Sequence, residues 1–112
     1  MWIAENLSKN TINKPTAESG NVVMSEIGRN ALVASGVHSG FNFVTPYGIY
    51  SIPPVNEKAV VLPLADMEVC VGVIYEISTV EPGEILLKSK GGAEVYLKND
   101  GSVYINGVKV GE

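Results

Sequence analysis

Three side chains in this sequence could form a nucleophilic catalytic site: His38, Asp66 and Cys70. A thiolate beside a histidine base that a carboxylate orients is a common arrangement for covalent catalysis. However, Cys70 lies in the middle of the apolar segment 68–77, where a free cysteine behaves as a small hydrophobic residue. No activated-nucleophile motif surrounds it. We therefore predict that Cys70 belongs to a core and that the chain is not an enzyme.

Two further patterns have chemical interpretations. Asp66 and Glu68 could bind a cation or serve as the carboxylate pair of a glycosidase, but they flank a predicted turn, which favours a solvated loop. Gly91-Gly92 could cradle a phosphate, but no helix follows to supply amide groups, which favours a hairpin turn. The sequence thus predicts no catalytic residue, no cofactor and no metal site.

Composition and charge restrict the class of protein. The chain has 112 residues, of which 46% are apolar and 18% charged, and its net charge is −4. These values are typical of an ordinary β-rich domain. Because no basic stripe is present, binding to a nucleic-acid backbone is not expected. The single cysteine excludes an intrachain disulfide, and without a long apolar run or a secretory signal we expect synthesis in a cytoplasm.

The residues between 20 and 82 are punctuated by prolines and show no sustained helical period. Short apolar runs bounded by turn residues predict strands near 22–24, 31–34, 37–45, 49–52, 59–64 and 68–77. Roughly five or six strands with turns every eight to twelve residues are typical of a small barrel of OB type or a compact sandwich. Residues 1–19 are expected to form a separate N-terminal segment that packs through Trp2 or stays poorly ordered.

Residues 83–112 are punctuated by glycine instead of proline, since the last proline is Pro82. Alternation predicts short strands with one apolar face, formed by Ile85, Leu87, Val95, Leu97, Val103, Ile105, Val108 and Val110. The predicted turn residues between these strands are Gly91, Gly92, Asp100, Gly101, Asn106 and Gly107. Such a ribbon is not stable alone in water, so its apolar face must be buried against the rest of the chain or against copies of itself.

The segment GGAEVYLKNDGSVYING resembles the repeat that opens the β-helical spike of central spike proteins from contractile-tailed bacteriophages. The matching positions are Gly92-Ala93, Leu97, Asp100-Gly101 and Ile105-Asn106-Gly107. The segment YGIYSIPPVNEKAVVLPL, residues 47–64, is similar to the OB-domain segment of the Mu-like baseplate protein family. Pro82-Gly83-Glu84 matches the junction between barrel and spike in that family.

This resemblance implies an all-β homotrimer: an OB-type barrel over residues 20–82 as a collar, then a short intertwined triple-stranded β-helix over 83–112. The eight apolar residues would be the trimer core, and the six turn residues would be the spike turns. The implied function is that of a structural virion component, a central spike below the tail tube that docks to tail hub proteins and helps to pierce the host envelope. Nucleic acid is not an implied partner.

Longer spikes of this family bind iron through a His-x-His element near the tip. Here the only histidine, His38, lies in the predicted barrel, so no tip metal is expected. The short spike suggests a separate tip protein as a cap. The alternative is a monomeric OB-type module that binds a glycan or single-stranded nucleic acid through aromatic rings. Such rings would come from Phe41, Phe43, Tyr47 and Tyr50.

Overall fold

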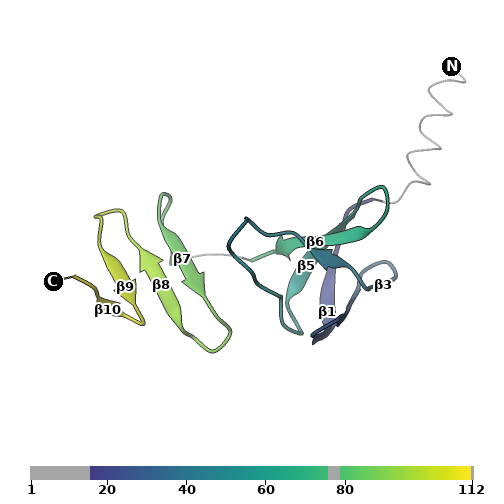
Figure 1. Ribbon diagram of the computed structural model, residues 1–112, viewed down its shortest axis with the longest axis horizontal. Coiled ribbons are helices and arrows are strands. Elements are labelled where there is room, and N and C mark those ends of the chain that lie inside the picture. The colour runs from purple at the N-terminus through teal and green to yellow at the C-terminus, as the bar shows by residue number, and fades with distance from the viewer. Residues whose placement is uncertain (1–15, 76–78, 112) are drawn as a thin grey trace, which may run out of the picture. The chain divides into compact units, whose positions relative to one another are not determined.

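A computed structural model describes residues 16–75 and 79–111 (Figure 1). Every regular element in these ranges is a strand, which confirms the predicted all-β class. The chain divides into two compact units between Ile74 and Tyr75, whereas the sequence places its break after Pro82. The predicted role of Trp2 lies outside the described residues. Within the described ranges, no helix is long and apolar enough to cross a membrane.

The first unit is a six-stranded sheet. Its strands are β1 (Glu18–Glu26), β2 (Arg29–Val33), β3 (Val37–Ser39), β4 (Asn42–Phe43), β5 (Lys58–Pro63) and β6 (Glu68–Val73). Their order is β3-β2-β1-β5-β6-β4, and every neighbouring pair is antiparallel except β4 and β6, which are parallel. The strand pairing in the described residues leaves β3 and β4 as edges, so the ladder does not close into a barrel.

Strand β1 organises this sheet because it pairs with a different strand along each half. Its first residues pair with β5 from Glu18 to Asn21, and its later residues pair with β2 from Asn21 to Glu26. The register with β2 shifts between Val22 and Met24, which marks a β-bulge. Since a bulge bends a strand and increases its twist, β1 can serve both halves of the sheet.

Where the two halves meet, β1 and β2 approach very closely. Gly20 is buried, and a Cβ atom built on it would lie 2.2 Å from the carbonyl oxygen of Val33. No side chain fits at that distance, so this crossing requires glycine.

The core of the first unit is small and apolar. Leu32, Val61 and Cys70 are completely buried. The other buried hydrophobic side chains are Val22, Phe41, Ala59 and Val69. The prediction that Cys70 is a core residue is therefore confirmed.

Two strand predictions in this unit differ from the structure. The predicted strand over 37–45 is broken at Gly40 and Phe41, because Gly40 has a positive φ of 68°. The side-chain amide of Asn30 also takes both backbone groups of Phe41, donating to its carbonyl at 2.9 Å and accepting from its N–H at 3.0 Å. The predicted strand over 49–52 is a loop, and Pro53 and Pro54 directly after it have no N–H to donate.

The second unit is a four-stranded antiparallel meander. Its strands are β7 (Ile85–Lys88), β8 (Glu94–Leu97), β9 (Val103–Ile105) and β10 (Val108–Lys109), in the order β10-β9-β8-β7. Tight turns join them, with positive φ at Gly92, Gly101, Asn106 and Gly107. None of residues 79–111 is buried, so this sheet is a single layer.

The close approach at Gly20 predicts a stability defect. Gly20→Ala should lower the free energy of unfolding by about 1–3 kcal/mol, because β1 and β2 must separate to admit the methyl group. Gly36→Ala is the matched control, since nothing lies within 4 Å of its Cβ position. We expect that control to stay within about 0.5 kcal/mol of the wild type in urea unfolding. Equal stability of the two variants would contradict the close approach of β1 and β2 at Gly20.

Candidate oligomerisation face

The apolar residues of the second unit form two rows across all four strands. One row follows the pairs Ile85–Leu97 and Leu97–Val103, and the N–H of Val110 donates to Val103 to extend it. The second row follows Leu87–Val95, Val95–Ile105 and Ile105–Val108. Because cross-strand partners point to the same side of a sheet, the eight predicted residues share one face. We call these eight residues the apolar face.

The apolar face is largely exposed in the single chain. Val108 exposes 68% of its surface and Ile85 exposes 54%, and Leu87, Leu97, Ile105 and Val110 are also exposed. Only Val95 and Val103, in the middle two strands, are half-buried. A contiguous exposed apolar surface on a small protein marks an interaction site. The geometry therefore identifies this face as the candidate functional surface of the second unit.

The opposite face is polar and aromatic. Tyr96 and Tyr104 are cross-strand partners, and the Nζ atom of Lys98 lies 5.5 and 5.4 Å from the two ring centroids. A lysine at this distance makes a cation–π contact with each ring. Because Lys98 occupies the rings, they are less available to stack on a sugar.

A carboxylate anchors this polar face to the start of the unit. The hydroxyl of Tyr96 donates to Oε1 of Glu84 at 2.5 Å, and the backbone N–H of Asn99 donates to Oε2 at 3.1 Å. The hydrogen bond to Glu84 raises the pKa of Tyr96 to about 12. The same bond, followed by the one from Asn99, lowers the pKa of Glu84. The residues that precede β7 are thus held to the turn between β8 and β9.

The six predicted turn residues all lie between strands. The N–H of Gly92 donates to Ser89 and that of Gly101 donates to Lys98, which closes two of the turns. Asn106 and Glu94 bond reciprocally, since each donates its backbone N–H to an oxygen of the other. Asp100 accepts the N–H of Ser102 at 2.9 Å, and bonds from Ser102 lower the pKa of Asp100. The Gly91-Gly92 pair is therefore part of a hairpin turn.

The candidate catalytic residues of the first unit are not brought together. His38 Nε2 lies 2.6 Å from Glu18 Oε1, and its Nδ1 lies 2.7 Å from Glu68 Oε2. Both ring nitrogens are thus occupied, while Cys70 is in the core and Asp66 is exposed.

The expectation of a solvated loop holds for Asp66 but is wrong for Glu68, which is half-buried in β6. Sequence reasoning missed Glu18 as well. The only local signal was its position two residues before buried Gly20 on β1, which indicates an inward direction but no partner.

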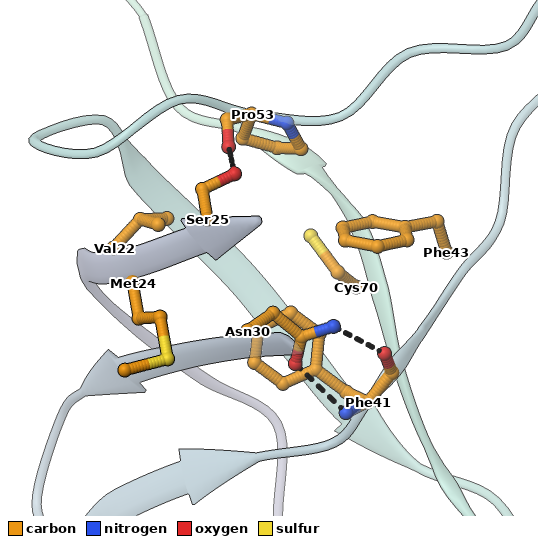
Figure 2. Close-up of a pocket in the computed structure, with 8 residues that line it drawn as sticks. All are labelled: Val22, Met24, Ser25, Asn30, Phe41, Phe43, Pro53 and Cys70. Carbon is orange, nitrogen blue, oxygen red and sulfur yellow. Dashed lines mark hydrogen bonds between the residues drawn. The ribbon is translucent and has the colours of Figure 1, made fainter. Parts of the chain in front are cut away.

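Figure 2 shows a pocket of the first unit, lined by Val22, Met24, Ser25, Asn30, Phe41, Phe43, Pro53 and Cys70. Phe41 and Phe43 meet edge to face there, with ring centroids 5.8 Å apart. The pocket is too small to admit a water molecule. Two of the four aromatic rings proposed for ligand stacking are therefore committed to packing. Over residues 16–75 and 79–111, no group of three or more His, Cys, Asp or Glu side chains is placed to hold a metal ion.

No protein-family model matches this sequence, and a search of curated proteins finds no significant match. The functional interpretation consequently depends on the chain's own residues and geometry.

The bond between Tyr96 and Glu84 predicts an unusual alkaline titration. The wild type should contain a tyrosine with a pKa of about 12, absent from Tyr96→Phe in ultraviolet difference spectra. Since the folded pKa is raised above 10.0, the associated stability is present below that pH and is lost as the pH rises to about 12. Glu84→Gln should lower this pKa. A Tyr96 that titrates at 10.0 in the wild type would contradict the bond.

Proposed function

We propose that this protein is a structural, homotrimeric central spike of a contractile phage-tail baseplate or of a tail-derived particle. The observation that carries the proposal is the apolar face: eight aligned side chains on a single-layer sheet, six of which are exposed. Three copies that turn this face toward a common axis would bury it. Strands β7 to β10 pair with one another within one chain, so each copy would supply one side of a three-sided prism. The short triple-stranded β-helix that the sequence resemblance implies has the same three-fold arrangement about an axis.

Strand length supports three copies. A four-residue strand such as β8 spans about 13 Å at ~3.3 Å per residue. A triangle with sides of that length has its centre about 4 Å from each side, close to half of the ~10 Å that separates packed sheets. The inward Leu, Ile and Val side chains would therefore meet at the axis and fill it. The glycine-containing turns would lie at the corners, where the chain must reverse direction within a few residues.

The topology of the first unit supports an OB-type collar. Its edge strands β3 and β4 are separated by only Gly40 and Phe41, so they can be considered two halves of one interrupted strand. The order β3-β2-β1-β5-β6-β4 then becomes a cycle of five strands with one parallel contact. A five-stranded, partly open barrel is the arrangement of the OB-fold. The pairing of β1 with both β2 and β5 fits the same cycle.

In this proposal the second unit transmits axial force and needs no cofactor. The outer face is stiffened by the Tyr96–Glu84 bond and by the contacts of Lys98 with two tyrosines. The collar would dock to tail hub proteins in the virion, and the spike would contact the host envelope during contraction. Strand β10 is the edge of the meander away from β7, and a separate tip protein would cover that end of the spike.

The alternative is a monomeric OB-type module for glycans or single-stranded nucleic acid. Tyr47 and Tyr50 support it, since they are 99% and 81% exposed in the loop after β4. However, no Asp, Glu, Lys, Arg or His lies between Phe43 and Glu57, so this loop offers no positive charge to a nucleic-acid backbone. The oligomeric state distinguishes the two functions.

The spike proposal predicts that the purified chain is a trimer, with a mass about three times 11.9 kDa in light scattering. Val95→Asp or Ile105→Asp should abolish the trimer, because three unpaired carboxylates would meet in a dry core and each costs several kcal/mol. Lys109→Asp is the matched control on the opposite face, since Lys109 pairs with Tyr104, and it should stay trimeric. A monomer at micromolar concentration, or normal assembly of both apolar-face variants, would refute the proposal.

A further inference from the structure

Three polar side chains from separate strands meet in the first unit. His38 on β3 contacts Glu18 on β1 through Nε2 at 2.6 Å, and contacts Glu68 on β6 through Nδ1 at 2.7 and 2.9 Å. Their side chains are only 17%, 25% and 32% exposed. The imidazole therefore lies between two carboxylates in a partly buried place, where charge-assisted hydrogen bonds are stronger than at the fully exposed surface.

The position of these residues in the sheet gives the contact its significance. Strand β3 is one edge of the sheet, and β6 lies next to the opposite edge strand, β4. Among the described residues, no strand pair joins β3 to β4 or to β6. The bond between His38 and Glu68 thus crosses the opening in the ladder, and the bond to Glu18 adds β1. These side chains connect strands that the backbone ladder leaves separate.

The protonation state of His38 decides whether both contacts are attractive. An imidazolium donates through both ring nitrogens, so each carboxylate receives one N–H. A neutral imidazole keeps one N–H, and its other nitrogen turns a lone pair toward a carboxylate. Loss of the proton therefore removes one hydrogen bond and leaves two negative charges without a positive partner between them.

The surroundings of His38 contain few other charges. Glu18 from β1 and Glu68 from β6 are the two charged groups in the described chain that act on its titration. Strand β2, which pairs with β3, places apolar Leu32 opposite His38. Ser35, in the connection between β2 and β3, donates to Glu18. The hydrogen bond to Glu18 is the largest cause that raises the pKa of His38, burial opposes it, and the bond to Glu68 adds to it.

We propose that Glu18, His38 and Glu68 form a pH-operated lock on the first unit. The lock holds β3 to β1 and β6 while His38 is protonated. When His38 loses its proton, one of its two hydrogen bonds to the carboxylates is lost. A metal ion is not the occupant of this cluster, because the two carboxylates lie on opposite nitrogens of the ring and cannot share one ion with a single nitrogen. The proposal does not depend on the spike function, since all three residues belong to the first unit.

The direction of the pH effect follows from linkage. The folded pKa of His38 is raised above 6.5, so its contribution to stability is complete below 6.5 and is lost as the pH rises through the folded pKa. The pKa of Glu18 is lowered from 4.5, first by Ser35 and then by His38, so its contribution is present above 4.5 and is lost as the pH falls through the folded pKa. The lock is therefore closed in mildly acidic medium and opens on the alkaline side.

The test uses the full-length chain and nuclear magnetic resonance of the imidazole C–H group. His38 is the only histidine, so its signal needs no assignment. We expect its pKa to exceed 6.5 in the wild type and to fall toward 6.5 in Glu68→Gln. Glu57→Gln is the charge-matched control at an exposed position of the same unit, and it should leave that pKa unchanged. A wild-type pKa at or below 6.5, or an equal effect of the two variants, would overturn the lock.

Thermal unfolding provides the second measurement. The Tm of the wild type should fall as the pH rises above 6.5, because the folded pKa of His38 is raised above that value. His38→Gln should lose that dependence, since an amide has no proton to release in this range. If His38→Gln does not fold, Glu68→Gln provides the comparison, because it keeps the Glu18 arm and should show a shallower decline. An identical decline in wild type and variant would refute the proposal.

Discussion

The structure depends most on the exposed apolar face of β7 to β10, which must be covered to be stable in water. Covering the exposed half of a Leu, Ile or Val side chain contributes on the order of 1 kcal/mol. Covering eight such side chains would therefore stabilise contact of this face with another surface, since no second layer within residues 79–111 buries it. The turns and the polar face keep the sheet regular, which lets copies pack against each other. The proposed trimeric spike is the assembly that meets this need with the strand lengths observed.

The first unit buries its apolar side chains within one chain. Its strands surround a small core that includes Leu32, Val61 and Cys70, and the bulge in β1 lets one strand join both halves of the sheet. Side chains connect segments that are not joined by strand pairing. Asn30 holds Phe41 between β3 and β4, and His38 joins β3 to β1 and β6. Hydrogen bonds from side chains therefore hold strands together at places where, in a closed barrel, strand pairing would do so.

Carboxylates join separate segments of the chain in both units, but with different consequences for pH. Glu84 accepts from a tyrosine hydroxyl and a backbone N–H, and these donors keep their protons throughout the neutral range. Glu18 and Glu68 instead accept from a histidine, which titrates near neutrality. The contacts of Glu84 are thus insensitive to physiological pH, as a proposed rigid element requires. The first unit contains a group whose charge can change there.

The sequence by itself determined the all-β class, the burial of Cys70, the eight residues of the apolar face and the positions of their turns. These features are local: a period of two assigns each side chain to a face, and glycine or asparagine at positive φ assigns each turn. Only the tertiary structure decided that 37–45 is interrupted, that 49–52 is a loop, and that Glu18, His38 and Glu68 meet. The hold of Asn30 on Phe41 and the contacts of His38 depend on partners 11 to 30 residues away, whereas the loop at 49–52 is set by Pro53 and Pro54 beside it. The direction of a side chain follows from its own strand, but its partner is set by how strands distant in sequence pair.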